Sequence, residues 1–215
     1  MFPDFLENPS DVAAPLLLGC TLTRTITLNG EKHKLVARIV ETEAYDQDDP
    51  ASHAFGGPSE RNAAMFGPAG HLYVYVSYGM HHCCNVVCGP EGLGSGCLVR
   101  AVEPLDGTAA MRELREAGRA GKVHTGHAGK EQAERARKHP LKLRDLTNGP
   151  GKVCAALDID KGLYGHDLTV EPLVLEFAPL LPGETIGSSP RVGISKNIDA
   201  PKRFFIEGNA FVSRA

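Results

Sequence analysis

The segment Val40-Glu41-Thr42-Glu43-Ala44-Tyr45 ends a predicted β-strand over residues 34–45 and decides the fold around it. Alternate residues of a strand share one face, so Glu41 and Glu43 lie on the same face as the apolar residues before them. A carboxylate on an apolar face must be paired, protonated or functional. Arg100, inside another apolar run, is the predicted partner that keeps one glutamate ionised. A functional site and a salt bridge at the strand end both remain open.

The second informative segment is Leu72-Tyr73-Val74-Tyr75-Val76-Ser77-Tyr78-Gly79-Met80, which holds three of the five tyrosines in the chain. A strand over residues 72–77 places Tyr73 and Tyr75 on one face, and Tyr78 follows it as a projecting tip. Packing of these rings in the core is the simpler alternative. A tyrosine wall beside an ionised carboxylate could instead hold a flat aromatic ligand and activate water next to it. A nucleobase flipped out of DNA is such a ligand.

The composition is that of an ordinary globular protein, with 42% hydrophobic and 23% charged residues among 215. This length favours one domain, residues 1–215. No run approaches the roughly 18 apolar residues of a membrane span, and the N-terminus lacks the basic region of a secretory signal. We therefore expect no membrane partner and a cytoplasmic location. The six cysteines are expected to be reduced thiols.

Charge is distributed unevenly along the chain, although the net charge is only −3. Residues 100–152 carry 12 basic and 7 acidic side chains, whereas residues 1–99 carry 5 and 11. The middle segment could form a basic face for nucleic acid. A solvated surface of helices and loops is an equally good interpretation.

The patterns predict an α+β fold with a mostly antiparallel β-sheet packed by helices at its edges. Asn29-Gly30 is a strong two-residue hairpin signal between strands 21–28 and 34–45. Residues 118–147 are predicted as loop with some helix, and residues 148–152 as a turn before an apolar element over 153–157. The other predicted elements are a helix capped by Ser10 and ending at Leu18, a hairpin of 83–88 with 97–103, a helix over 108–116, and strands over 168–170, 173–177, 192–194 and 203–206.

Clustered histidines and cysteines suggest a zinc site around His81-His82-Cys83-Cys84, with Cys88 and Cys97 nearby. Strand neighbours on one face are about 7 Å apart, which is too far for ligands of one zinc ion. Buried reduced thiols are therefore expected, and no metal. The acidic loop with Asp46, Asp48, Asp49 and His53 could bind a cation, but a solvated loop is the favoured interpretation.

Several segments occur in an order and spacing typical of one family. They are 38–45, 61–66, 70–75, Tyr78-Gly79-Met80, Asn85, 98–105, Gly149-Pro150-Gly151-Lys152 and Arg191-Val192-Gly193. With these segments the chain resembles alkyladenine-type DNA glycosylases, also called mammalian-type 3-methyladenine DNA glycosylases, from Pro15 to Val212. The resemblance implies a single compact domain with a curved antiparallel sheet and no cofactor or metal.

The resemblance also implies roles for individual residues. Glu43 would be the general base for a water molecule that Arg100 and the backbone carbonyl of Val192 help to hold. The flipped base would stack between Tyr45 and His53 on one face and Tyr75 on the other, with Asn85 at the pocket floor. Tyr78 would fill the gap left in the duplex, and Met80, His81 and Lys152 would lie along the DNA backbone.

The sequence departs from the family pattern in two places. His81, His82 and Cys84 replace bulky aromatic or apolar residues after Tyr78-Gly79-Met80, so backbone contacts near His81 could differ. The loop between Glu43 and His53 is one residue shorter than in the mammalian form, which could reshape the pocket.

The resemblance thus implies a monofunctional DNA glycosylase that removes alkylated or deaminated purines from duplex DNA. Expected substrates are 3-methyladenine, 7-methylguanine, hypoxanthine and ethenoadenine. The signature strands supply no lysine to attack the sugar, so no strand cleavage is expected. We expect a monomer, associated with the nucleoid in a bacterial cell or nuclear in a eukaryotic one. The alternatives are a catalytically silent nucleic-acid-binding protein and a metal-dependent hydrolase.

Overall fold

A long β-hairpin starts the sheet on which the candidate site is built. The computed structural model describes residues 4–121 and 141–213. Strands β1 (Thr21–Leu28) and β2 (Glu31–Tyr45) pair in antiparallel register from Leu28↔Glu31 to Thr21↔Arg38. Asn29 and Gly30 between them have positive φ angles of 52° and 84°. Such angles at both central residues are those of a type I′ turn, so the Asn-Gly prediction is confirmed.

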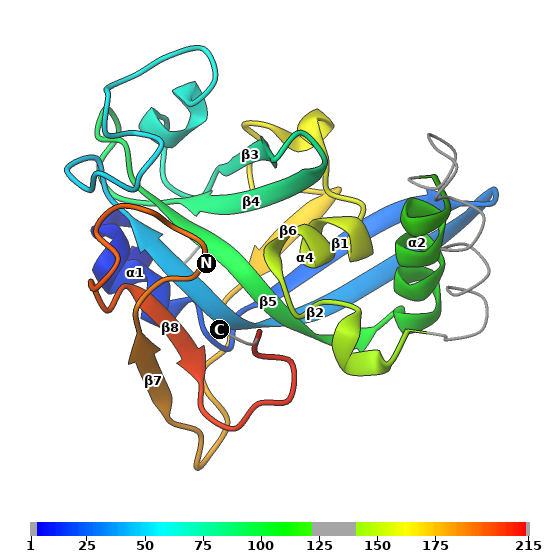
Figure 1. The fold of residues 1–215 in the computed structure, drawn as a ribbon. Helices are drawn as coiled ribbons and strands as arrows, with labels where there is room; N and C mark the ends of the chain where they lie inside the picture. Colours follow the sequence, from blue (N-terminus) through cyan, green and yellow to red (C-terminus); the bar gives the residue numbers. More distant parts are fainter. Residues whose placement is uncertain (1–3, 122–140, 214–215) are drawn as a thin grey trace.

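The sheet has eight strands, and β2 is its central member (Figure 1). One edge of β2 pairs with β5 (Gly96–Asp106). The other edge pairs first with β1 and then, at residues 41–43, with β8 (Arg203–Ile206). The remaining strands are β3 (Leu72–Ser77), β4 (His81–Val87), β6 (Leu173–Glu176) and β7 (Ile186–Ser189), in the order β3-β4-β5-β2-β1-β6 with β7 on β8.

The sheet is curved, and irregular pairing in β2 marks where it bends. The register between β2 and β5 shifts at Val36/Ala37, Ile39/Glu41 and Glu41/Thr42. An extra residue on one strand bends that strand and increases its local twist. Two of the three shifts flank Glu41, so the bend falls at the carboxylates. The predicted α+β fold, a single compact domain with a curved antiparallel sheet and flanking helices, is confirmed.

Within residues 4–121 and 141–213, three helices pack on the sheet: α1 (Ser10–Leu16), α2 (Thr108–Gly121) and α4 (Pro150–Ala156). Helix α4 lies against β4 and β5, and α2 lies beside α4 (Figure 1). Ser10 was predicted to cap the first helix, and this is wrong. Pro9 occupies the cap position, and the backbone N–H of Ser10 donates to Asp46 Oδ1 at 3.0 Å. A carboxylate 36 residues away in sequence thus satisfies the first turn of α1.

The C-terminal third contains the other errors of the sequence prediction. Residues 168–170 form a turn in which the Asp167 carboxylate accepts the backbone N–H of Thr169. Residues 192–194 form a loop rather than a strand, and Gly193 there has a φ of 77°. Strand β7 was missed, and residues 150–152 open helix α4 instead of forming a turn. The prediction for residues 118–147 falls mainly outside the described residues.

Among the helices of the described residues, none combines the length and the apolar character needed to cross a bilayer.

Gly107 connects β5 to α2 and should not tolerate a side chain. Its φ is 74°, and a Cβ there would lie 2.6 Å from the carbonyl oxygen of Lys34. Gly107→Ala should lower the free energy of unfolding by about 3 kcal/mol, because strain and a backbone clash add. Gly183→Ala is the matched control, since Gly183 has a φ of 85° but nothing within 4 Å of a Cβ. That change should cost about 1 kcal/mol. Urea unfolding of both variants gives the comparison, and equal losses would contradict the steric argument.

Candidate active site

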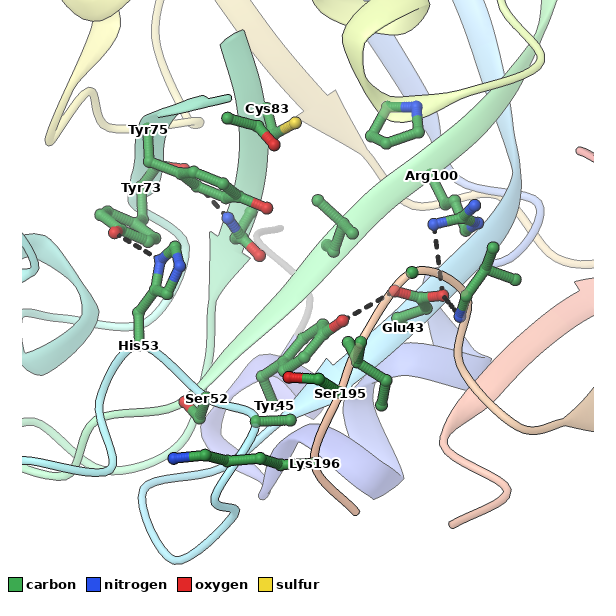
Figure 2. Close-up of a pocket in the computed structure, with 18 of the residues that line it drawn as sticks. Glu43, Tyr45, Ser52, His53, Tyr73, Tyr75, Cys83, Arg100, Ser195 and Lys196 are labelled. Carbon is green, nitrogen blue, oxygen red and sulfur yellow. Dashed lines mark hydrogen bonds and ion pairs between the residues drawn. The ribbon is translucent and has the colours of Figure 1, made fainter. Parts of the chain in front are cut away.

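A pocket of about 560 Å³ opens between the β3–β4 hairpin, the bend of β2 and the loop after Arg191 (Figure 2). Glu43 and Arg100 lie on one side of it, and the aromatic rings of His53, Tyr73 and Tyr75 lie on the other. Every residue predicted to act on water or to hold a base lines this pocket. Val192 belongs to the loop that covers Glu43. These lining residues are Glu43, Tyr45, His53, Tyr75, Asn85, Arg100 and Val192.

Glu43 is fully buried and held by three groups. Its Oε1 accepts the backbone N–H of Val192 at 2.8 Å and lies 3.3 Å from Nη1 of Arg100. Its Oε2 accepts the hydroxyl of Tyr45 at 2.8 Å. A carboxylate oxygen can accept two hydrogen bonds. Among the described residues, no second donor reaches Oε2, so this oxygen keeps one position for a water molecule in the pocket.

Glu41 is also fully buried, but it does not line the pocket. Oε1 is 2.7 Å from Nε of Arg203, 2.9 Å from Nε of Arg100 and 2.8 Å from the hydroxyl of Ser213. Oε2 accepts the backbone N–H of Ser213 at 2.6 Å. The salt-bridge alternative therefore describes Glu41, and Arg100 joins the two glutamates. Glu41 has a structural role in this network, which leaves Glu43 as the carboxylate open to the pocket.

The aromatic wall consists of three rings in contact. The rings of Tyr73 and Tyr75 are stacked with centroids 5.6 Å apart, and His53 meets Tyr75 edge-on at 4.5 Å. Nδ1 of His53 is 2.9 Å from the hydroxyl of Tyr73. Tyr45 stands between this wall and Glu43 (Figure 2). The period-two prediction for β3 is confirmed, because Tyr73 and Tyr75 share this face while Leu72 and Val74 lie in the main core.

Tyr45 and the three side chains of this wall are uncharged at neutral pH. Burial raises the pKa of Tyr73 to about 12, and it also raises the pKa of Tyr75. Burial, reinforced by the charge of Glu43, raises the pKa of Tyr45. Burial and then the nearby charge of Arg61 lower the pKa of His53 below its usual 6.5. The wall therefore offers neutral π-faces, which suit stacking on a flat ring.

The floor of the pocket comes from β4 and β5. Asn85 pairs with Tyr73 across the sheet, and its Nδ2 donates to the backbone carbonyl of Tyr73 at 3.3 Å. Cys83 lines the pocket beside Tyr75, and burial raises the pKa of its thiol to about 11. Cys83 is therefore a protonated thiol at neutral pH.

The tip of the β3–β4 hairpin projects at the mouth of the pocket. Tyr78 lines the pocket and is 84% exposed, with a φ of 50° that a non-glycine residue rarely adopts. Gly79 follows with a φ of 68°, and Met80 is 64% exposed. These three residues connect Ser77 to His81. The tip therefore presents the Tyr78 ring and the Met80 side chain to solvent at the pocket mouth.

His81 and Lys152 lie beside the pocket rather than in it. His81 packs on the first turn of α4, where a Cβ on Gly151 would come within 3.0 Å of the His81 Cβ. Lys152 lines a second cavity of about 470 Å³ that also contains Arg100 and Arg144. Nζ of Lys152 donates to Oδ1 of Asn148 at 2.7 Å. Residues 122–140 of the basic segment lie outside the described residues, so the proposed basic face is seen only in part.

The clustered cysteines and histidines separate in three dimensions. Cys83 faces the pocket, whereas Cys84 belongs to the main core. Sγ of Cys88 is 3.7 Å from Sγ of Cys97 in the core. Over residues 4–121 and 141–213, no three histidine, cysteine, aspartate or glutamate side chains are placed to hold one metal ion.

The acidic loop is not simply solvated, which corrects the favoured interpretation of it. Asp46 accepts the Ser10 backbone N–H and the hydroxyl of Ser95, and it pairs with Lys202. Asp49 is only 2% exposed and lies 2.5 Å from Nη1 of Arg191. Burial is the largest influence and disfavours its ionisation, but the contacts with Arg191, Ala51 and Asn197 together outweigh it and hold the pKa of Asp49 below its usual value.

Several pocket residues were not foreseen from the sequence. Loop residues Ser195 and Lys196 lie just after the Arg191-Val192-Gly193 motif, and proximity to that motif was the only signal for them. The prediction that the signature strands supply no lysine is unaffected, because Lys196 lines the pocket from a loop. Lys196 runs past Tyr45 and Ser52, on the side opposite Arg100 (Figure 2). The other unforeseen lining residues are Pro50, Ala51, Ser52, Met65, Cys83, Leu98, Pro150, Gly193 and Ile194.

The model of the methylpurine-DNA glycosylase family matches residues 4–210. The chain belongs to this family. A provisionally named 3-methyladenine DNA glycosylase of Nitrosospira multiformis is 43% identical over 98% of this chain and 92% of its own length. Proteins with the same provisional name are 46% identical in Agrobacterium fabrum, over 82% and 77%, and 41% in Methanoculleus marisnigri, over 98% and 96%.

Membership places the protein among the hydrolytic DNA glycosylases, which act on DNA in base excision repair. The predicted family, enzyme class and DNA substrate are confirmed. The two alternatives, a silent binding protein and a metal-dependent hydrolase, receive no support from the comparisons.

Glu41→Gln should destabilise the fold by about 3 kcal/mol, because it leaves Arg100 and Arg203 buried beside a neutral amide. The change keeps the size of the side chain, so the loss reports the ionic network and not a cavity. Glu43→Gln is the control and should cost clearly less, since one oxygen of Glu43 faces the pocket. Urea unfolding of both variants tests this. Equal stability of Glu41→Gln and the wild type would refute the structural role of Glu41.

Proposed function

We propose that the protein flips alkylated or deaminated purines out of duplex DNA and hydrolyses their N-glycosidic bond with a water molecule activated by Glu43. The proposal rests mainly on Glu43, whose Oε2 has one open position and which lines the pocket beside the aromatic rings. The base classes are 3-methyladenine, 7-methylguanine, hypoxanthine and ethenoadenine. We also propose that the protein acts as a monomer. Because genomic DNA is the proposed substrate, its location would be the nucleoid of a bacterial cell or the nucleus of a eukaryotic one.

In the proposed chemistry, the water oxygen forms a bond to C1′ of the sugar while the bond from C1′ to the purine nitrogen breaks. The water proton passes to Glu43, and the bonding electrons leave with the base. Arg100 stabilises Glu43 in its ionised form, and the backbone N–H of Val192 fixes its Oε1. The resemblance implied that the carbonyl of Val192 helps to hold the water. The contact that supports a role for Val192 is instead the bond from its backbone N–H to Glu43.

Leaving-group chemistry divides the proposed substrates into two classes. A base such as 3-methyladenine or 7-methylguanine is cationic in the nucleotide and departs as a neutral molecule. Hypoxanthine and ethenoadenine are neutral and need a proton or a hydrogen bond at the purine as they leave. For the cationic bases, selection can therefore rest on flipping and on the fit within the pocket.

The proposed binding mode places the flipped base between the rings of Tyr45 and Tyr75. His53 was expected on the Tyr45 side, but its ring contacts Tyr75 at 4.5 Å, so it lies on the same side of the pocket as Tyr75. Tyr45, His53 and Tyr75 are neutral at neutral pH. The rings around the base therefore carry no charge that would exclude either class of base. Asn85 at the floor would meet the exocyclic amine of an undamaged guanine and disfavour it. Burying an unmatched polar group costs about 1–3 kcal/mol, which is enough to discriminate between bases.

Contacts with the duplex are proposed for the hairpin tip and the first turn of α4. Tyr78 would fill the gap left by the flipped nucleotide, since its ring is exposed at the pocket mouth. Met80, His81 and Lys152 would follow the phosphate backbone. Burial and then the charge of Arg115 lower the pKa of Lys152, and a DNA phosphate would oppose this by stabilising the cation.

Glu43→Gln should lower the single-turnover rate of base release by at least about 100-fold, because the amide cannot accept the water proton. Binding to a duplex with a damaged base should stay within about threefold, since size and shape are kept. Release of hypoxanthine and of 7-methylguanine from oligonucleotides gives the measurement. Glu91→Gln, on an exposed loop, is the matched control. A near wild-type rate in Glu43→Gln would show that Glu43 is not the base.

Tyr78→Ser should weaken flipping more than the first encounter with DNA. An unstacked base loses a few kcal/mol, and an inserted ring recovers part of it, so we expect about a tenfold smaller flipping constant. Stopped-flow fluorescence with an ethenoadenine duplex separates the two steps. Tyr78→Phe keeps the ring and should behave as the wild type. If Tyr78→Ser leaves the flipping constant unchanged, another residue fills the gap.

A further inference from the structure

Arg191 is a buried cation that touches neither the pocket nor solvent. Its side chain is 0% exposed, and it is absent from the residues that line the pocket. Its guanidinium carbon lies 4.5 Å from the centroid of the Tyr45 ring, on which it is stacked. Because Tyr45 lines the pocket and Arg191 does not, the guanidinium supports the ring from the side away from the ligand.

The guanidinium is fixed in this place by two partners. Nη1 lies 2.5 Å from Oδ2 of Asp49 and donates to the backbone carbonyl of Ala44 at 2.8 Å. Ala44 immediately precedes Tyr45, so Arg191 contacts both the backbone before the tyrosine and its ring. Asp49 is itself held by the backbone N–H of Ala51 at 3.0 Å and by Asn197 at 3.2 Å.

Stability alone does not account for this arrangement. Nε and Nη2 of Arg191 have no hydrogen-bond acceptor among the described residues, although both are buried. A buried donor without a partner costs about 1–3 kcal/mol, and a buried ion pair is often no more stabilising than apolar residues of the same size. An imperfectly satisfied buried cation is more readily explained by what it positions.

The structure assigns Arg191 as a positioning residue for the reaction: anchored by Asp49, it holds Tyr45 so that the Tyr45 hydroxyl orients Oε2 of Glu43. The hydroxyl is 2.8 Å from Oε2, the oxygen with a position left for water. The chain of contacts is therefore Asp49, Arg191, Tyr45 and Glu43, and only the last two reach the pocket. This inference rests on the proposed role of Glu43 and adds the device that aims it.

A double-mutant cycle between Arg191→Met and Tyr45→Phe tests the assignment. Tyr45→Phe keeps the stacking ring and removes only the hydroxyl. Arg191→Met should lower the single-turnover rate of hypoxanthine release by about 10- to 100-fold, as expected for a misplaced catalytic group. In the Tyr45→Phe background, the same change should cost less than about threefold, because there is no hydroxyl left to aim. The Kd for the damaged duplex should change less than the rate. Additive losses would show that Arg191 acts on something other than Tyr45 and would overturn the assignment.

A measurement without catalysis separates this inference from the proposed function. The ¹³Cζ signal of Tyr45 can be identified by its loss in Tyr45→Phe, and Arg191→Met should shift it while the other four tyrosines stay in place. If Arg191→Met does not fold, Asp49→Asn removes the anchor and should give the same changes with smaller size. A wild-type protein that releases no base refutes the proposed function, whereas an active wild type with an unshifted Tyr45 signal in these variants refutes the inference alone.

Discussion

Arg100 between Glu41 and Glu43 is the interaction on which the rest of the structure depends. The two carboxylates lie on one face of β2, and the arginine reaches them from β5. Removing such charges from water costs several kcal/mol per ion, so they persist only where hydrogen bonds replace the lost water. Glu41 obtains these bonds from Arg203 on β8 and from Ser213. The network therefore forms only when β2, β5, β8 and the segment after it have all come together.

This network explains why only one of the two carboxylates, that of Glu43, lines the pocket. Glu41 lies outside the pocket lining, where Arg203 and Ser213 bind it, and Glu43 keeps a position open on Oε2 that faces the pocket. The sheet places the charged groups rigidly, because strands paired on both edges cannot shift by a residue without moving every side chain to the other face. Loops supply most of the remaining pocket: His53 comes from the segment after β2, and Val192 and Lys196 come from the loop between β7 and β8. A rigid chemical centre with loop-built walls is a common division in enzymes.

The electrostatic character of the pocket follows from burial. Desolvation raises the pKa values of the tyrosines and of Cys83 and lowers that of His53, so each of these groups stays neutral. Charge is confined to Glu43 and Arg100 at one end and to Lys196 at the rim. For the proposed reaction this separation is useful, because stacking and proton transfer occur at different ends of the same cavity. The exposed Tyr78 ring stands apart from both, on the hairpin tip.

By itself, the sequence determined the central hairpin, the common face of Glu41 and Glu43, the tyrosine face of β3 and the family. These features follow from local rules: the Asn29-Gly30 turn, the alternation of strand side chains and motifs of fixed spacing. The resemblance pointed to Glu43, but only the tertiary structure shows why Glu41 does not face the pocket, because Glu41 is bound by Arg203 and Ser213, more than 160 residues away. The tertiary structure also decides that Asp49 is buried and not solvated, because its partner Arg191 lies far away in the sequence. Residues 192–194 have the composition of a strand, yet they form a loop because the N–H of Val192 bonds to Glu43 instead of to a neighbouring strand. Local pattern specifies which face a side chain takes, whereas the partner across the fold specifies whether its charge is satisfied.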